Sequence, residues 1–121
     1  LFRSLGMAWP DRVPHPGYGC DWTTASQWTF EPLDNEAFPA VELAKHVGSA
    51  GLTYPAVFNA ANEQAVIAFH AGAIGYLDIL DVVRAAVDEH APEPELTLES
   101  VLQAESTARA RADQLIVRLS S

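Results

Sequence analysis

The sequence predicts a mainly α fold: a four-helix bundle that follows a loop-rich segment carrying one short strand. Three observations support this. Apolar residues recur at helical spacing in four segments, short connections join these segments, and three prolines and two glycines crowd residues 8–20. We therefore divide the chain into a loop-rich connecting segment with a short helix and one strand, residues 1–35, and a helical bundle, residues 36–121.

The loop-rich segment carries the candidate strand. Residues 1–8 favour two helical turns that end before Pro10. Residues 27–31, QWTFE, place the aromatic Trp28 and Phe30 in an alternating, β-favouring run. A single strand leaves its backbone groups unpaired. The run is therefore either an extended segment packed by its aromatic rings or a strand whose partner lies outside this chain.

The first bundle helix is expected to begin at a cap supplied by Asp34 or Asn35, with Pro39 in its first turn. Gly48 is placed to end it. The apolar stripe of this helix is Phe38, Val41, Ala44 and Val47.

The helix expected from Thr53 onward is the one around which the bundle is organised. Thr53 is its predicted cap and Pro55 fits its first turn. Asn59, Asn62 and Glu63 share one face of an otherwise apolar helix, so we expect these polar groups to be paired. The remaining residues form a broad apolar arc, which predicts burial on several sides: Tyr54, Val57, Phe58, Ala61, Ala65, Ala68, Phe69 and Gly72.

Two further helices complete the predicted bundle. Residues 76–90 carry one apolar stripe, and Thr97 caps the last helix, with Leu96 and Val101 at the positions of a hydrophobic staple. Glu105 and Arg109 form an i,i+4 pair in the favourable order. The stripe of the first is Ile79, Leu80, Val83, Ala86 and Val87; the seam of the second is Val101, Ala104, Ala108, Ala112, Leu115, Ile116 and Leu119.

Composition limits the classes of partner. Seven Lys and Arg against 16 Asp and Glu give a net charge of −9, so we expect neither nucleic acid nor an anionic membrane as a partner. No run approaches the ~18 apolar residues of a membrane helix. The start lacks the pattern of a signal peptide and an initiator Met, which suggests that translation does not begin at Leu1. A lone Cys20 favours a reducing, cytoplasmic setting.

Candidate catalytic residues are few. His70, Asp78 and Asp81 offer the donor types that divalent cations accept, but their spacing fits helix-start charges and a packing histidine better. We interpret the other histidines (His15, His46 and His90) as structural or solvated, and Cys20 as inert. Glu63 beside Asn62 fits a hydrogen-bond cluster better than a catalytic carboxylate. We therefore expect no catalytic, cofactor-binding or metal-binding residue in this segment.

Four stretches, in order, resemble one enzyme family. AWPDRV at 8–13, TAS-x-W-x-FEPLD at 24–34, FPAVELA at 38–44 and FNAANEQAVIAFHAGAIGYLDI at 58–79 are similar to the C-terminal part of 1-deoxy-D-xylulose 5-phosphate (DXP) reductoisomerase. The FEPLD wording resembles actinobacterial members, whereas LFRS at the start departs from the expected proline-containing pattern.

The resemblance implies a three-part parent enzyme of the non-mevalonate (MEP) isoprenoid pathway. An N-terminal Rossmann domain would bind NADPH, a central domain would hold Mg or Mn and the substrate, and a helical bundle would follow; the parent is usually a homodimer. The family's nucleotide, metal and substrate residues all align upstream of Leu1, so none is assigned here and the segment alone should be inactive.

Within such a parent, this segment is expected to support the catalytic domain. Asn59, Asn62 and Glu63 would pin the central helix to its neighbours or to that domain, and the run with Trp28 and Phe30 would find its partner there. The alternative is a free-standing helical interaction module without catalytic activity.

Overall fold

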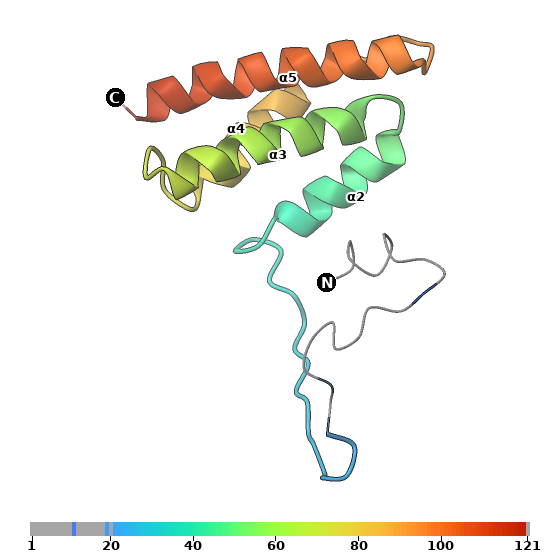
Figure 1. The fold of residues 1–121 in the computed structure, drawn as a ribbon, viewed down its shortest axis with the longest axis vertical. Helices are drawn as coiled ribbons and strands as arrows, with labels where there is room; N and C mark the ends of the chain where they lie inside the picture. Colours follow the sequence, from blue (N-terminus) through green and yellow to red (C-terminus); the bar gives the residue numbers. More distant parts are fainter. Residues whose placement is uncertain (1–10, 12–18, 20, 121) are drawn as a thin grey trace. The chain divides into compact units, whose positions relative to one another are not determined.

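The computed structural model describes residue 11, residue 19 and residues 21–120. The chain divides into two compact units, Leu1–Pro32 and Leu33–Ser121, and each is considered by itself. Within the described residues, the second unit contains the helices α2 (Ala40–Ala50), α3 (Tyr54–His70), α4 (Asp78–Asp88) and α5 (Leu98–Leu119) (Figure 1). The mainly α fold predicted from the sequence is confirmed.

Helix α3 lies at the centre of the bundle, as its apolar arc predicted. It packs against α2, α4 and α5, and Figure 1 shows α5 running alongside it. Ile67, an apolar residue of α3 outside the predicted arc, is exposed. The buried members of α3 are Val57, Ala60, Ala61, Ala65 and Ala68.

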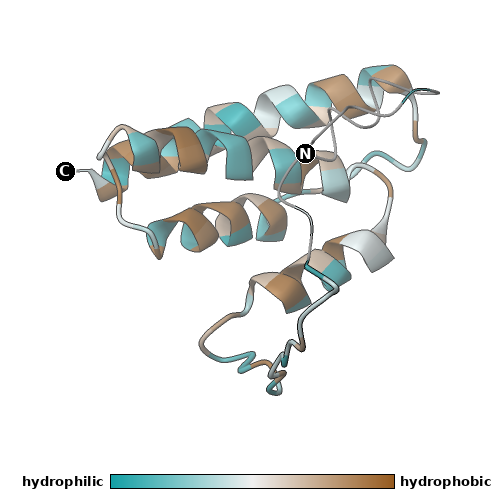
Figure 2. Cartoon of the chain, turned by 60° about the horizontal axis from the view of Figure 1, so that its bottom comes forward, coloured by the Kyte–Doolittle hydropathy of each residue, from teal (hydrophilic) through white to brown (hydrophobic). Residues whose placement is uncertain are grey.

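The core is built from small side chains. Among the described residues fourteen hydrophobic side chains are buried: eight are alanines, five are valines and one is Ile74. Short side chains let helix axes approach closely, so the packing depends on the absence of bulk rather than on large rings. Figure 2 shows hydrophilic and hydrophobic residues alternating along each helix.

Helix α2 starts later and ends later than expected. Neither Asp34 nor Asn35 caps it, and Pro39 stands at the N-cap position instead of in the first turn. The Asp34 carboxylate accepts hydrogen bonds from the backbone N–H groups of Glu36 and Ala37, both at 3.0 Å, and so stabilises a preceding turn. The helix continues through Gly48 and ends at Gly51, whose φ of +67° suits glycine. Of the apolar residues through which the helix was expected to run, Val41, Ala44 and Val47 lie in α2 and only Val47 is buried; Phe38 precedes the helix.

Helix α3 begins at Tyr54 with Pro55 in its first turn, as predicted, but Thr53 does not cap it through its side chain. The Thr53 hydroxyl is buried and meets His90 instead. Helix α4 spans Asp78–Asp88 and is therefore shorter than the predicted 76–90. Tyr76 and Leu77 lie exposed in the turn before it. Its stripe is confirmed at Val83, Ala86 and Val87, with Val82 also buried.

Helix α5 has the predicted cap. Thr97 Oγ1 accepts a hydrogen bond from the Ser100 N–H at 3.0 Å, and Ser100 Oγ accepts one from the Thr97 N–H at 2.9 Å. These two bonds form a capping box. The predicted seam is confirmed at Ala104, Ala108 and Ala112, which are buried. It is wrong at Leu119, which is exposed in the last turn.

The first unit is described only in part. The two turns expected at residues 1–8, His15 and Cys20 lie outside the described residues. Residues 27–31 have no regular secondary structure, so the strand expected there is not formed with any described part of this chain. Trp28 is 66% and Phe30 84% exposed, and their ring centroids lie 6.5 Å apart.

Candidate functional site

A polar seam joins α3 to α5 at the predicted polar face. Arg109 on α5 donates through Nη2 to the Glu63 carboxylate and, at 2.7 Å, to Glu105. Its Nη1 donates to Gln64 Oε1 at 3.2 Å, and Gln64 Nε2 donates to Asp113 Oδ1 at 2.8 Å. The hydrogen bonds to Glu105 and then to Glu63 raise the pKa of Arg109 above its usual value. The predicted i,i+4 pair is therefore confirmed, and it forms part of a contact between two helices.

The three polar residues singled out on α3 behave differently from one another. Glu63 pairs with Arg109 while its side chain stays half exposed. Asn59 is exposed and Asn62 half-buried, and among the described residues neither side chain has a hydrogen-bond partner. Pairing with a described residue is thus found at Glu63 alone, and the expected pairing of Asn59 and Asn62 stays a prediction. The carboxamides remain available to a partner outside the described chain.

The metal-ligating candidates do not come together. His70 is exposed at the end of α3, and Asp78 accepts a hydrogen bond from the Gly75 N–H at 2.7 Å, which fits a helix-start role. Across residues 21–120, no three His, Cys, Asp or Glu side chains are grouped to hold a metal ion. The described residues therefore offer no donor set for a divalent cation, and we assign no metal-dependent step to them.

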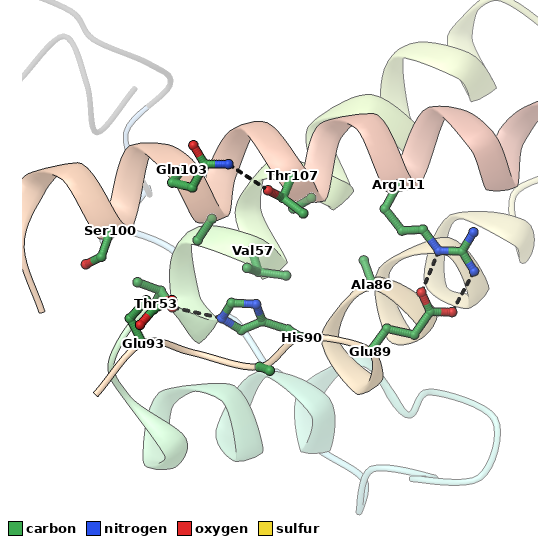
Figure 3. A pocket seen from close by; sticks show the side chains of 13 residues that line it. Thr53, Val57, Ala86, Glu89, His90, Glu93, Ser100, Gln103, Thr107 and Arg111 are labelled. Atoms are coloured by element: carbon green, nitrogen blue, oxygen red, sulfur yellow. Dashed lines mark hydrogen bonds and ion pairs between the residues drawn. The ribbon is translucent and has the colours of Figure 1, made fainter. Parts of the chain in front are cut away.

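A hollow of about 350 Å³ opens where α3 begins, α4 ends and α5 passes across both (Figure 3). It exists because its floor is made of short side chains from three helices. Polar groups surround this floor: they come from α5, from Thr53 just before α3, and from Glu89, His90 and Glu93 just after α4. The floor residues are Val57, Ala86, Ala104 and Ala108.

His90 occupies one wall of the hollow. Its Nε2 lies 2.8 Å from Thr53 Oγ1, and the Tyr54 hydroxyl donates to the His90 carbonyl at 3.3 Å. The Tyr54 ring meets the imidazole edge-on with centroids 4.9 Å apart. Burial among these groups lowers the pKa of His90 below its usual value. His90 thus ties the end of α4 to the start of α3, in agreement with a structural role.

Glu89 and Arg111 close the opposite wall. Arg111 donates through Nε and Nη2 to the two Glu89 oxygens, both at 2.6 Å, in a bidentate pair drawn in Figure 3. Hydrogen bonding to Arg111 lowers the pKa of Glu89, and the same bonds raise the pKa of Arg111. The pair fixes α4 to α5 at the surface.

Sequence reasoning missed both walls. Thr53 and His90 are 37 residues apart, and Glu89 and Arg111 are 22 apart. Helical spacing predicts partners only three or four residues away, so no local signal points to either contact. The charged residues at the end of α4 and along α5 show only that ion pairs between these helices are possible.

Comparison with known proteins decides the family. The protein-family model for the DXP reductoisomerase C-terminal domain matches residues 4–111, most of the chain. The chain belongs to the DXP reductoisomerase family. This confirms the resemblance found in the four sequence stretches.

Individual reductoisomerases match nearly the whole chain. A relative from Leifsonia xyli subsp. xyli is 67% identical over 115 residues, 95% of this chain and 32% of that protein. One from Arthrobacter sp. (strain FB24) is 60% identical over 111 residues, 92% of this chain and 28% of that protein. The reductoisomerase of Zymomonas mobilis, solved in complex with NADPH, superposes with a TM-score of 0.73 at 41% identity over 91% of this chain and 29% of that one.

The chain thus spans about 30% of the length of these relatives. In its described residues no helix is both long and apolar enough to cross a membrane.

Proposed function

We propose that this chain is the C-terminal structural domain of a DXP reductoisomerase and that it acts by supporting the catalytic domains. The observation that carries the proposal is the 67% identity to the Leifsonia reductoisomerase across 95% of this chain. The intact protein would convert DXP with NADPH and a divalent cation, Mg or Mn, in the MEP pathway, as a cytoplasmic homodimer. The neighbour from Zymomonas mobilis was solved with NADPH, which supports the nucleotide.

The division of labour follows from what the described residues offer. They have no donor set for a metal ion. The groups with shifted pKa values that line the hollow are engaged in structural contacts, Glu89 with Arg111 and His90 with Thr53. Their interactions instead join helices to one another. The contribution of this segment is therefore a rigid frame that holds groups of the other domains in position.

Two features are suited to contact with those domains. The exposed rings of Trp28 and Phe30 would leave water on docking, which stabilises association by about 25 cal/mol per Å² of apolar surface. Asn59 and Asn62 present carboxamides that have no described partner, so they can bond backbone groups across an interface. The boundary between the connecting segment and the bundle, after residue 35, belongs to the same proposal.

The test uses the intact enzyme with Asn62→Ala, Glu63→Ala and Phe30→Ala. A supporting role predicts a fall in Tm of several degrees for each variant, with KM for DXP and kcat nearly unchanged at a temperature where the variant is folded. Ser106→Ala, at an exposed polar position of α5, is the control and should leave Tm within about one degree.

Two outcomes would contradict the proposal. A variant with wild-type Tm and a large selective loss of kcat would place the residue in the catalytic machinery. A start codon directly before the codon for Leu1 would make the chain a protein in its own right, in favour of the interaction module.

A further inference from the structure

The hollow beside His90 continues into a second one along the first turns of α5. The second hollow, about 310 Å³, shares Glu93, Ser100 and Gln103 with the first. Together they form one groove, which runs from the Glu89–Arg111 pair to the capping box of α5. We call this the α5 groove. All of its lining belongs to the unit Leu33–Ser121.

The two ends of the α5 groove differ in chemistry. At the His90 end the floor is apolar, formed by Val57, Ala86, Ala104 and Ala108. The polar groups there are already satisfied, since Thr53 meets His90 and Arg111 is held by Glu89. A ligand at this end therefore gains mainly by covering apolar surface.

The other end carries uncompensated negative charge. Glu93, Glu95 and Glu99 line it, and no described residue forms a side-chain hydrogen bond or ion pair with any of the three. The cation of the groove, Arg111, is engaged in a bidentate pair at the far end. The unpaired carboxylates thus select for a positively charged partner.

We propose that the α5 groove is a docking site for a basic, amphipathic peptide segment of a partner protein. An apolar side chain of the segment enters the hollow over Ala104 and Ala108, and Lys or Arg side chains one to two turns away reach Glu93, Glu95 and Glu99. Charge complementarity is the argument for this occupant, because the chain carries −9 overall and concentrates free carboxylates here. The inference goes beyond the supporting role proposed above and does not depend on it.

The test measures binding of synthetic peptides to the full chain by fluorescence anisotropy. The first peptide carries Leu on one helical face and Lys on the other. A second replaces Lys by Glu, and a third replaces Leu by Ser. The groove predicts saturable binding of the Leu/Lys peptide, weaker at high salt, and no binding of the other two.

Paired variants locate the site. Glu93→Gln with Glu95→Gln should weaken binding roughly threefold to tenfold, because exposed ion pairs contribute modestly. The control Glu31→Gln with Glu36→Gln removes the same charge elsewhere and should leave affinity unchanged. Thr107→Trp fills the hollow from an exposed helix position and should abolish binding, whereas Ser106→Trp, next to it and outside the lining, should not. Circular dichroism checks that each variant is folded.

Three results would overturn the proposal. Equal binding of the Ser/Lys peptide would reduce the effect to charge attraction. Binding that survives both Thr107→Trp and the Glu93/Glu95 change would put the site elsewhere. Self-association of the chain that Thr107→Trp removes, without peptide binding, would make a second copy of the chain the occupant.

Discussion

At the scale of single residues, His90 has the clearest consequence for pH. Burial lowers the pKa of His90 in the folded chain, whereas an unfolded chain holds histidine near its ordinary value of about 6.5. As pH falls through this value, the unfolded state binds more protons than the folded state. The stability that depends on neutral His90 is therefore fully present above about pH 6.5 and is lost as pH falls through the lowered pKa.

Substitution isolates this contribution. His90→Gln keeps a polar group near Thr53 and removes the titration, so its free energy of unfolding should vary less with pH between about 5 and 7 than that of the wild type. Glu89, Glu93 and Arg111 line the same hollow, so the informative quantity is the difference in unfolding free energy between wild type and variant at each pH. Urea unfolding at a series of pH values measures this difference. His46→Gln, at an exposed position of α2, is the control. An identical pH profile for wild type and His90→Gln would contradict the assignment.

At the scale of the element, the cap of α5 can be tested alone. Thr97→Ala removes the oxygen that accepts from the Ser100 N–H and should lower the free energy of unfolding by about 1 kcal/mol. Ser106→Ala, in the exposed middle of the same helix, should be neutral or slightly stabilising because alanine is the better helix former. Denaturant unfolding compares the two. Equal effects would mean that the capping box contributes nothing measurable.

The helices also show how far the sequence could lead. Apolar spacing identified α3, the last two helices and the Thr97 cap, because these depend on residues within one or two turns. Local rules misassigned two residues with capping side chains. Asp34 found backbone N–H groups in a turn before α2, and Thr53 found His90. For Asp34 the alternative partners are backbone N–H groups two and three residues away, and for Thr53 the alternative partner is the distant His90. A side chain that can cap a helix can also make these other hydrogen bonds, so its residue type does not determine which bond forms.

The candidate site was predictable only in part for the same reason. Glu63 was identified as a polar residue needing a partner, but its partner Arg109 lies 46 positions away. The floor of the α5 groove is formed by four short residues on three helices, which no sequence window contains. The candidate strand with Trp28 and Phe30 has no partner among the described residues, and residues 27–31 have no regular secondary structure there, so neither of the two alternatives for this run is decided by the described fold.

At the scale of the whole molecule, the bundle depends on close packing through alanines. Ala112 on α5 is completely buried, whereas Ala110, two residues earlier on the same helix, is exposed. Ala112→Leu forces extra carbons between helices that meet through short side chains, and we expect it to cost about 1–3 kcal/mol of unfolding free energy. Ala110→Leu adds the same atoms toward water and should change stability by less than about 0.5 kcal/mol. Thermal and urea unfolding of the two variants compare them. If Ala112→Leu were as stable as Ala110→Leu, the helices would have room to separate, and a rigid frame built on alanine contacts would no longer explain the supporting role proposed for this domain.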